Sequence, residues 1–570
     1  MKTLMLHCDY IKWSAQKKAL KNIDELFPNQ ELNGESNDCL TVLIAVEKND
    51  TIDLVKKLKS EIEKLSENLK TKKIVLYPYS HLSKDLGSPS RAIEILDETA
   101  KSLKGFTVSR APFGYYKELE LKVKGHPLSE LSREIKGDEE VLEISKEEKQ
   151  NLIKKLSKVK MQAPRGKNDL KSTVELGRDL DLYVVNELVG QGLPLLTPKG
   201  TAIKRELERF IVDEEIKRGY EHTSTPVMAK SDLYKISGHW QHYKNDMFVL
   251  NVKEGDFALR PMTCPFHFVL YKRKQRSYRD LPKRYAEIAS LFRNEQSGEL
   301  RGLTRLRQFT LADAHIICTP EQVEEEFMNV VDLIKYVMST LGIEVWYRFS
   351  KWDPKNKRGK YIDNPKAWEA TQKSMKKILD KLKIKYVEKE DEAAFYGPKL
   401  DLQYNDVYGK EDTLITVQID FANPENFELT YLDKDGKEKN AMVIHRSSTG
   451  ATERIISYIL EKNQGNLPLW LSPIQVKILS MGEDCNKYSN KIKSELISNG
   501  IRAEVDTSNE SIGKKVRNAL TEKVFYIATV GRNEVDDEKV SIRSRDSKDL
   551  SSMKINDFIK LLKEEISKRK

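Results

Sequence analysis

One stretch of the chain, FRNEQSGELRGLTRLRQF from Phe292 to Phe309, concentrates side chains that could hold a nucleotide. Arg293 and Glu295 stand two positions apart, and Arg305 follows after a glycine-containing turn. A guanidinium holds phosphate or carboxylate oxygens in fixed geometry, a carboxylate accepts from an amino group, and a ring stacks on a heterocycle. A nucleoside triphosphate makes all three demands, and the pattern predicts a β-hairpin that presents these groups.

The phosphate-binding loops with a recognisable sequence pattern are missing. The chain has no GxxxxGK[ST] loop and no strand-linked GxGxxG, which excludes P-loop and Rossmann sites. Taken alone, the stretch is more often an exposed, salt-bridged hairpin. Two other segments change that balance: KRGYEHTSTP (Lys217 to Pro226), in which a proline closes a strand, and HRSSTGATERIISYIL, in which Gly450 precedes Arg454 by four positions at the start of an apolar-periodic helix.

In this order, the three segments resemble the signature motifs of class II aminoacyl-tRNA synthetases. Within that class, RPMTCPFH, LADAHIIC, AFYGPKLD, TVQIDF and MVIHRSSTGATER are similar to segments of threonyl-tRNA synthetases. The resemblance extends from about Lys171 to the C-terminal block. It implies a core made of an antiparallel sheet flanked by helices, which binds ATP in a bent form.

The resemblance also implies roles for the nucleotide-binding residues. Arg293 would hold the α-phosphate and the amino-acid carboxylate, Arg305 and Arg454 would hold the outer phosphates, Glu295 would meet the adenine amino group, and Phe309 would stack on the base. The implied reaction joins L-threonine and ATP, with Mg²⁺, into threonyl-adenylate and pyrophosphate. A second step passes threonine to the 3′ end of tRNA(Thr).

A zinc site is implied at Cys264, His315 and His445, one ion per subunit. The three residues share no CxxC or HxxxH spacing, so only the resemblance points to them; a lone buried Cys or His is usually structural. One Cys and two His leave zinc open to a substrate, and the amino and hydroxyl groups of threonine can then both bind the metal. Valine lacks the hydroxyl and cannot bind in this way.

Three further residues would line the threonine pocket. Asp313 would accept from the substrate hydroxyl, Tyr396 would approach its amino group, and Gln418 would complete the wall. Leu311 stands where the bacterial pattern has Gln, so the rim of the pocket differs from that pattern.

Serine carries the same hydroxyl and differs from threonine by one methyl group, which a pocket distinguishes by only about 1–3 kcal/mol. A second site that hydrolyses Ser-tRNA(Thr) is therefore expected. The nine histidines supply no HxxxH pair, so the bacterial type of editing domain is absent. HCDY, YPYSHLSKDLGSP, RAPFGYYK and KGHPLSELSR instead resemble the archaeal editing domain, which is related to D-aminoacyl-tRNA deacylases.

In that domain Lys117 would stabilise the developing oxyanion or position the attacking water. Tyr116, His81 and Glu130 would shape the serine pocket and the site of the terminal adenosine. Without the resemblance, Lys117 is more simply an exposed strand lysine. Cys8 has no His and Asp partner pattern that supports a thiolate mechanism.

The elements that must position these residues follow from periodicity. TLMLH, TVLIAVE and KIVLYPYS predict strands, and RAIEILDETAKSLKG predicts a helix. QVKIL, IRAEVD, VFYIATVG and KVSIRSR alternate with helices in the last block and predict a small α/β domain with a mainly parallel sheet. This block resembles an anticodon-binding domain, in which Glu534 and Arg543 would read bases, although both also suit exposed structural charges.

We therefore expect an α/β multidomain chain. The predicted domains are an editing domain at 1–135, a helical linker at 136–185, a class II catalytic domain at 186–470 and an anticodon-binding domain at 471–570. The first class II motif implies a homodimer.

The composition agrees with this expectation. Of 570 residues, 33% are charged and 39% hydrophobic, and the net charge of +10 favours a polyanionic partner. Five cysteines make no disulfide framework, which suits a reducing cytoplasm. No signal peptide and no apolar run of about 18 residues is present, so we expect neither secretion nor a membrane span.

Three alternatives remain. The first alternative, a prolyl- or seryl-specific relative, would leave the presence of Cys264, His315 and His445 beside AFYGPKLD unexplained. A synthetase-like RNA-binding regulator, or a deacylase fused to an inert scaffold, usually lacks the phosphate-binding arginines, all of which this chain keeps.

Overall fold

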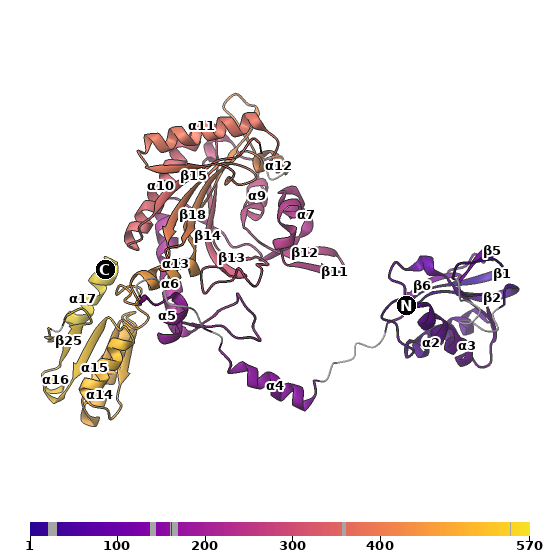
Figure 1. Cartoon of the computed structure of the whole chain (residues 1–570), viewed down its shortest axis with the longest axis horizontal. Coiled ribbons are helices and arrows are strands. Elements are labelled where there is room, and N and C mark those ends of the chain that lie inside the picture. Colours follow the sequence, from indigo (N-terminus) through magenta and orange to yellow (C-terminus); the bar gives the residue numbers. More distant parts are fainter. Residues whose placement is uncertain are drawn as a thin grey trace. The chain divides into compact units, whose positions relative to one another are not determined.

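The computed structural model describes residues 1–20, 31–136, 144–159, 161, 169–355, 361–547 and 549–569. The chain forms two compact units, Met1–Ser145 and Lys146–Lys570 (Figure 1). Every helix in the described ranges is too short or too polar to cross a membrane.

The first unit is a sheet covered by two helices on one face. Its strands are β1 (Lys2–Lys18), β2 (Asn33–Ala45), β3 (Lys73–Pro78), β4 (Thr107–Arg110), β5 (Tyr115–Val123) and β6 (Glu130–Glu134), and its helices are α2 (Leu54–Leu69) and α3 (Pro89–Ser102). The order is β4-β3-β2-β1-β5, with β6 also paired to β1. The strands and the helix expected in this block are present.

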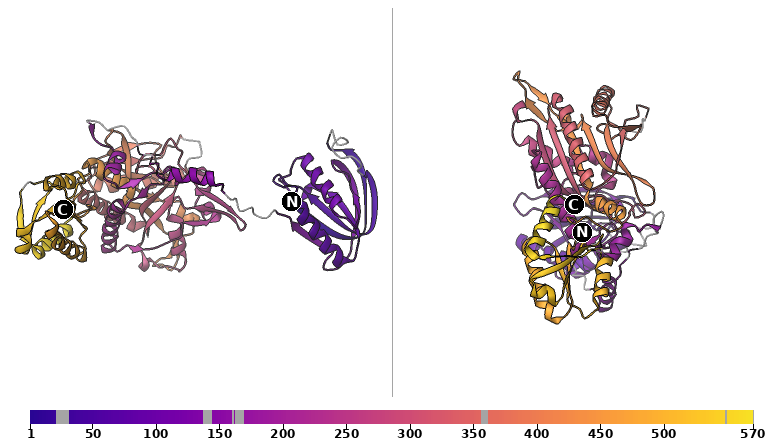
Figure 2. Two further views of the ribbon diagram at one scale, coloured as in Figure 1. Left: turned by 90° about the horizontal axis from the view of Figure 1, so that it is seen from below. Right: turned by 90° about the vertical axis from the view of Figure 1, so that its left-hand side faces the viewer.

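Side chains that alternate along β2 build two separate cores on the two faces of this sheet. Leu40, Val42 and Ile44 pack with side chains of α2 and α3, the two helices that lie on one side of this sheet (Figure 2, left). Cys39 and Leu43 pack on the opposite face, toward β5. The period of two is what a sheet buried on both faces requires.

The second unit contains an eight-stranded sheet in its described residues, in the order β16-β15-β17-β18-β21-β14-β13-β9. These strands are β9 (Glu221–His222), β13 (Lys283–Phe292), β14 (Gln308–Cys318), β15 (Trp346–Ser350), β16 (Tyr386–Lys389), β17 (Lys399–Asn405), β18 (Glu411–Asp420) and β21 (Met442–Ala451). The five central strands from β17 to β13 pair antiparallel, as expected for this core.

Helices and short strands surround the sheet. The helices are α4 (Lys146–Leu156), α5 (Thr173–Asp179), α6 (Pro198–Lys217), α7 (Ser231–Ile236), α8 (His239–Tyr243), α9 (Cys264–Lys272), α10 (Val323–Thr340), α11 (Pro365–Lys381), α12 (Asn423–Asn426) and α13 (Thr452–Lys462). The short strands are β7 (Tyr183–Val184), β8 (Leu195–Leu196), β10 (Met228–Lys230), β11 (Val249–Val252), β12 (Gly255–Leu259), β19 (Thr430–Leu432) and β20 (Glu438–Asn440).

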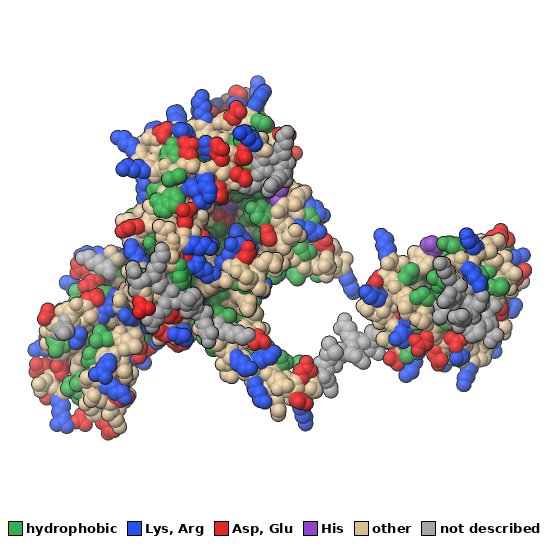
Figure 3. Space-filling view, viewed as in Figure 1, with side chains coloured by type: hydrophobic (Ala, Val, Ile, Leu, Met, Phe, Trp, Pro, Cys, Tyr) green, Lys and Arg blue, Asp and Glu red, His purple; other side chains and the backbone are tan. Residues whose placement is uncertain are grey.

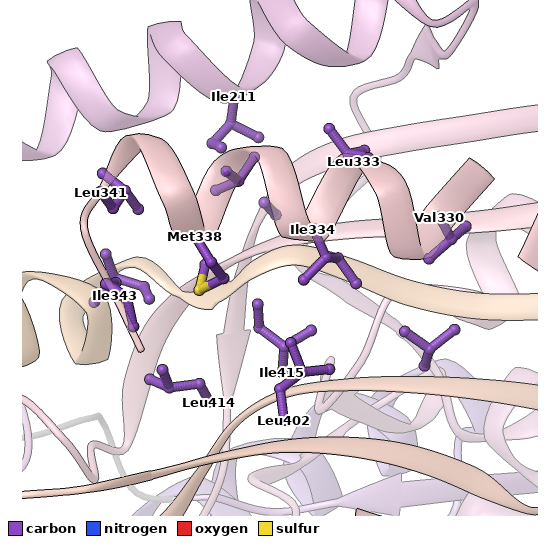
Figure 4. Close-up of a cluster of buried hydrophobic side chains, with 14 of the residues drawn as sticks. Ile211, Val330, Leu333, Ile334, Met338, Leu341, Ile343, Leu402, Leu414 and Ile415 are labelled. Atoms are coloured by element: carbon purple, nitrogen blue, oxygen red, sulfur yellow. The ribbon is translucent and has the colours of Figure 1, made fainter. Parts of the chain in front are cut away.

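One face of the sheet is closed by α10. Its apolar residues recur with helical spacing, and Ile334 and Met338 pack over Leu402 and Ile415 of the strands below (Figure 4). Each such side chain contributes about 1.5–3 kcal/mol when fully buried. The short helix α9 packs on the opposite face, where Ile317 joins its core. That second face carries the site described below.

The hairpin expected at Phe292–Phe309 exists, but its geometry differs from the expectation. Strands β13 and β14 pair with Phe292 opposite Gln308, so the cationic residues 293–307 form a long loop between the strands. Arg301 and Arg305 meet within that loop in an isolated bridge. The arginine-rich segments are therefore presented by the loop and not by the strands.

The C-terminal part of the second unit is an α/β sheet in the order β23-β22-β24-β25-β26. Its elements are β22 (Val476–Ser480), α14 (Glu483–Ser498), β23 (Ala503–Asp506), α15 (Ile512–Thr521), β24 (Tyr526–Val530), α16 (Arg532–Asp536), β25 (Lys539–Ser544), β26 (Ser551–Lys554) and α17 (Ile555–Ser567). Of the four strands predicted here, β23, β22 and β24 run parallel, as expected. The prediction was wrong for β25, which pairs antiparallel with β24, and the further strand β26 pairs antiparallel with β25. The connection from β24 to β25 holds only the short α16, and a parallel crossover needs about a dozen residues.

Candidate active site

Three adjacent strands place the predicted metal and substrate residues in one row. His315 of β14 pairs directly with His445 of β21, and His445 pairs on its other side with Gln418 of β18. Asp313 lies two residues before His315 and therefore on the same face of the sheet. Residues separated by more than 100 positions in the sequence thus become neighbours through strand register.

Cys264 completes a set of three possible metal ligands from the first turn of α9. One ligand atom from each of Cys264, His315 and His445 lies within 4.8 Å of the others, and all three residues are buried. Burial raises the pKa of the Cys264 thiol well above its usual range and lowers the pKa of His315. A divalent cation bound there would stabilise the thiolate form of Cys264, and the Cys and His donors suit zinc.

Two residues that the sequence did not single out hold the imidazoles. Asp420 Oδ2 lies 2.7 Å from His445 Nε2, and His267 Nδ1 lies 2.8 Å from His315 Nδ1. Both residues occur inside the quoted segments TVQIDF and RPMTCPFH, but nothing in their spacing reveals these contacts. Metal-binding histidines usually have such a partner for the second ring nitrogen. The donor set and its surroundings therefore fit a metal centre.

Every residue predicted for ATP, threonine or metal lines one cavity of about 450 Å³. Figure 3 looks onto a hollow in this unit, with histidine atoms inside it and Lys and Arg side chains around it. The predicted residues in the cavity wall are Cys264, Arg293, Glu295, Arg305, Phe309, Leu311, Asp313, His315, Tyr396, Gln418, His445 and Arg454. The cavity is also lined by Lys399, which pairs with Gln418 in the sheet and was passed over in the segment AFYGPKLD.

The nucleotide end of the cavity is built by the loop after β13. The Arg293 guanidinium lies 5.1 Å from the centre of the Phe309 ring, and crowding by neighbouring protein atoms lowers its pKa although the residue stays partly open to solvent. Arg305 Nε donates to Glu295 Oε2 at 2.8 Å. Two solvent-accessible cations, one beside a ring and one beside an acceptor, form a polarised surface that suits a nucleotide.

The backbone around Gly450 fixes the third arginine. Gly450 has φ +76°, and a Cβ atom built there would lie 2.0 Å from the carbonyl oxygen of Leu414. Only glycine fits both the conformation and the close approach of strands β18 and β21. Arg454, in the first turn of the following helix α13, donates to the backbone carbonyls of Thr304 and Thr413. These bonds tie the helix to both walls of the cavity.

The end of the cavity predicted to hold the amino acid is lined by buried and half-buried side chains. The Tyr396 hydroxyl donates to Gln418 Oε1, and the Tyr396 ring lies 5.1 Å from the ring of His445. Burial raises the pKa of Asp313, whose carboxylate lies 3.9 Å from His315 Nε2. A small polar substrate in this region would have a carboxylate, a phenol and an amide to bind.

A separate cavity of about 580 Å³ lies in the first unit and is lined by His81, Tyr116 and Lys117. Lys117 Nζ donates to the carbonyl of Pro112 at 2.9 Å and lies 4.8 Å from the centre of the Tyr77 ring. Burial lowers the pKa of Lys117 to about 8. Lys117 is therefore a half-buried lysine with a lowered pKa at the wall of a cavity, and not an ordinary exposed one.

The structure does not bring Glu130 to this cavity. Lys117 pairs with Ala15 of β1, whereas Glu130 pairs with Leu6 of the same strand. At about 3.3 Å per residue, the two positions lie roughly 30 Å apart along β1. Its role in editing therefore stays a prediction without support from this placement. Cys8 is buried, and burial raises its thiol pKa to about 11, which disfavours a thiolate.

The two residues predicted to read the anticodon have structural partners or a partly buried position. Glu534 accepts from the backbone N–H of Gly531 at 2.8 Å and from Ser541 Oγ at 2.7 Å. Arg543 lies on β25, and its Nε is buried without a hydrogen-bond partner. Both carboxylate oxygens of Glu534 already have partners, so the prediction for Glu534 is the weaker of the two.

Three family models match the chain. The Archaea-specific editing domain of threonyl-tRNA synthetase matches residues 1–135, the tRNA synthetase class II core domain (G, H, P, S and T) matches residues 245–463, and an anticodon binding domain matches residues 475–565. The archaeal type of editing domain expected at the front of the chain is thus confirmed.

Curated relatives match the chain over a shared segment. The chain is 54% identical over 400 residues to a threonine–tRNA ligase of Clostridium perfringens and 44% identical over 397 residues to a threonine–tRNA ligase of Exiguobacterium sp.. Each match covers 69% of this chain, which spans 62% and 61% of the length of these two relatives.

Solved structures extend the comparison. The chain is 26% identical to a putative threonyl-tRNA synthetase of Aeropyrum pernix, with a TM-score of 0.61 and coverage of 70% of this chain and 97% of that one. A prolyl-tRNA synthetase of Cryptosporidium parvum, 15% identical with a TM-score of 0.55, covers 72% of this chain and 80% of its own and shares the fold alone. The RNA binding domain of threonyl-tRNA synthetase from Cryptosporidium parvum is 34% identical with a TM-score of 0.66, and the match covers 69% of this chain and 98% of that domain. The chain described here belongs to the threonyl-tRNA synthetase family.

Proposed function

We propose that the protein is a threonine–tRNA ligase with its own editing site. In the first step a carboxylate oxygen of L-threonine attacks the α-phosphorus of ATP, and the bond to the β-phosphate oxygen breaks. The products are threonyl-adenylate and pyrophosphate. In the second step the 3′-terminal ribose of tRNA(Thr) takes the threonyl group and AMP leaves.

The observation that carries this proposal is the single cavity that joins a metal-ligand set to a nucleotide-binding loop. Arg293 lines this cavity near both Glu295 and Tyr396 and is suited to hold the carboxylate and the α-phosphate together as negative charge develops. Arg305 and Arg454 are suited to the outer phosphates with their Mg²⁺, and Phe309 and Glu295 to the adenine. These assignments require Arg305 to exchange its bond with Glu295 for phosphate oxygens.

We assign zinc to Cys264, His315 and His445, one ion per subunit. Bound there, zinc would act as a Lewis acid toward the amino and hydroxyl groups of the substrate. Asp313 can accept a hydrogen bond from the same hydroxyl. Valine offers no hydroxyl, so these buried polar groups would stay unpaired, and such sites reject the analogue strongly.

Serine has the hydroxyl that valine lacks, so the proposed zinc site would accept it. We assign the second selection step to the first unit. We propose that Ser-tRNA(Thr) is hydrolysed in the cavity lined by Lys117, Tyr116 and His81. At pH 7 most Lys117 side chains are cationic, given a pKa of about 8, and can stabilise the oxyanion that forms when water attacks the ester. With Cys8 as a buried thiol, the water itself is the nucleophile.

The remaining assignments follow from the proposed reaction. The C-terminal α/β sheet would bind the anticodon, the first class II motif would form a homodimer interface, and the reaction belongs in the cytoplasm, where tRNA is charged for translation.

Charging of tRNA(Thr) with labelled threonine, together with deacylation of preformed Ser-tRNA(Thr), tests the proposal. We expect the native chain to do both, and the Lys117→Met variant to charge normally but to leave Ser-tRNA(Thr) intact. A chain that binds tRNA(Thr) yet neither charges nor deacylates it would instead be an RNA-binding regulator with a synthetase fold.

A further inference from the structure

A chain of hydrogen bonds runs from the proposed metal centre into the protein behind it. His315 Nδ1 and His267 Nδ1 lie 2.8 Å apart, and both rings are buried. The other nitrogen of His267, Nε2, lies 3.0 Å from Thr223 Oγ1 and 3.7 Å from Glu287 Oε2. Thr223 follows strand β9, so these hydrogen bonds link the metal ligand His315 to the segment that contains the first class II motif.

The contact between two Nδ1 atoms fixes how protons are placed on both rings. A hydrogen bond needs one N–H and one lone pair, so only one of the two nitrogens is protonated. If His267 were the donor, neutral His315 would carry its proton on Nε2 and could not bind a metal through that atom. If His315 is the donor, its Nε2 lone pair is free, and His267 must carry its own proton on Nε2.

The environment of His267 favours the second arrangement. A proton on His267 Nε2 faces the hydroxyl of Thr223 and the carboxylate of Glu287. Burial tends to raise the pKa of Glu287, but hydrogen bonds from His267 and Thr225 and the charge of Arg260 lower it to about 2, so the carboxylate stays anionic. An anion at this place attracts the N–H and leaves the Nδ1 lone pair of His267 toward His315.

The second histidine of the site is held in a comparable way. His445 Nε2 faces Asp420 Oδ2 at 2.7 Å. Asp420 itself accepts from the backbone N–H groups of Ala422 and Asn423 at 2.8 and 2.9 Å. The carboxylate is therefore fixed as an acceptor, and the Nδ1 lone pair of His445 is left for a metal.

We propose that His267 is a positioning residue of the metal centre, which acts as an obligatory hydrogen-bond acceptor and holds His315 in the tautomer that ligates through Nε2. The inference rests on the proposed zinc site. It assigns a role to a residue that does not touch the metal, and it explains why a third histidine is buried behind two histidine ligands.

Zinc affinity, measured by competition with a chromophoric chelator, and the visible absorption of the Co²⁺-substituted full-length protein test this role. His267→Phe keeps a ring but removes the acceptor, whereas His267→Asn keeps an acceptor oxygen near the position of Nδ1. Loss of the hydrogen-bond partner of a metal ligand costs about 10–100-fold in metal affinity. We therefore expect a loss of that size in His267→Phe, together with an altered Co²⁺ spectrum. In His267→Asn, which keeps an acceptor, we expect a loss of at most about threefold.

Phe268→Leu is the matched control for lost packing. Phe268 is the next residue of α9, is fully buried, and packs against the ring of His315 at 5.9 Å without a hydrogen bond. We expect Phe268→Leu to lower the unfolding midpoint of the metal-free protein but to leave zinc affinity and the Co²⁺ spectrum unchanged.

Three outcomes would overturn the inference: native zinc affinity in His267→Phe, equal losses in His267→Phe and His267→Asn, or an equal loss in Phe268→Leu. A native protein that binds no zinc would overturn the metal site itself, which distinguishes failure of the proposed function from failure of this inference.

Discussion

Replacement of Gly450 by alanine isolates the contribution of backbone geometry to the proposed nucleotide site. The new Cβ would lie 2.0 Å from the Leu414 carbonyl oxygen, whereas real Cβ contacts stay beyond 3.0 Å. Strands β18 and β21 must therefore separate by about 1 Å. The positive φ adds about 1–2 kcal/mol of backbone strain for a residue with a side chain.

The shift would reach Arg454, which lies four residues further on and is bonded to Thr413 on the displaced strand. A misplacement of about 1 Å at a reacting geometry costs about 100-fold in rate, or roughly 3 kcal/mol. We therefore expect Gly450→Ala to lower kcat/KM for ATP in threonine-dependent pyrophosphate exchange by about 100-fold, while the protein stays folded.

Gly436→Ala is the control for strain alone. Gly436 has φ +75°, nearly the same value, but a Cβ added in this exposed turn between β19 and β20 would have no atom within 4 Å. We expect a loss of about 1 kcal/mol in stability and normal exchange activity. If Gly450→Ala kept exchange within about threefold of the native rate, the account of how β18 and β21 position Arg454 would be refuted.

Three further predictions concern single side chains. Arg293→Ala is expected to abolish ATP turnover, because, of the described cations that line this cavity, Arg293 is the one whose guanidinium lies beside the Phe309 ring; normal turnover would contradict the assignment of the α-phosphate. Lys117 has a folded pKa of about 8, so its cation is lost as the pH rises through that value. The difference in Ser-tRNA(Thr) deacylation rate between native and Lys117→Met protein should therefore fall above pH 8, and a difference that rises there would point to a general base instead. Asp406 is a buried partner of Arg301 and anchors the loop after β13 to the turn between β17 and β18. Loss of this charged hydrogen bond in Asp406→Asn is expected to raise KM for ATP roughly tenfold, and an unchanged KM would show that the loop is held by other contacts.

Apolar patterning predicted the elements that pack into a core. The apolar run in TVLIAVE corresponds to β2, which is buried on both faces of the sheet, and the helical spacing in RAIEILDETAKSLKG corresponds to α3, which buries one stripe of side chains. The antiparallel course of β25 was missed because propensity describes a strand and not its direction. Direction was decided by the short connection through α16.

The site was predictable only through motifs. Cys264, His315 and His445 come from a helix and two strands, and strand register brings them together, so no local spacing encodes them. His267 and Asp420 were missed for the same reason, since a hydrogen bond between distant segments leaves no pattern in either. Gly450 was recognised as part of a motif, but the reason that this position requires glycine is the nearby carbonyl oxygen of Leu414 on the neighbouring strand.

The most direct test of the central claim is ATP–pyrophosphate exchange with threonine, serine, valine and proline, before and after zinc chelation. The account predicts exchange with threonine, weaker exchange with serine, none with valine or proline, and loss of all exchange on chelation that added zinc restores. Exchange with valine as strong as with threonine, or exchange that survives complete removal of zinc, would contradict it.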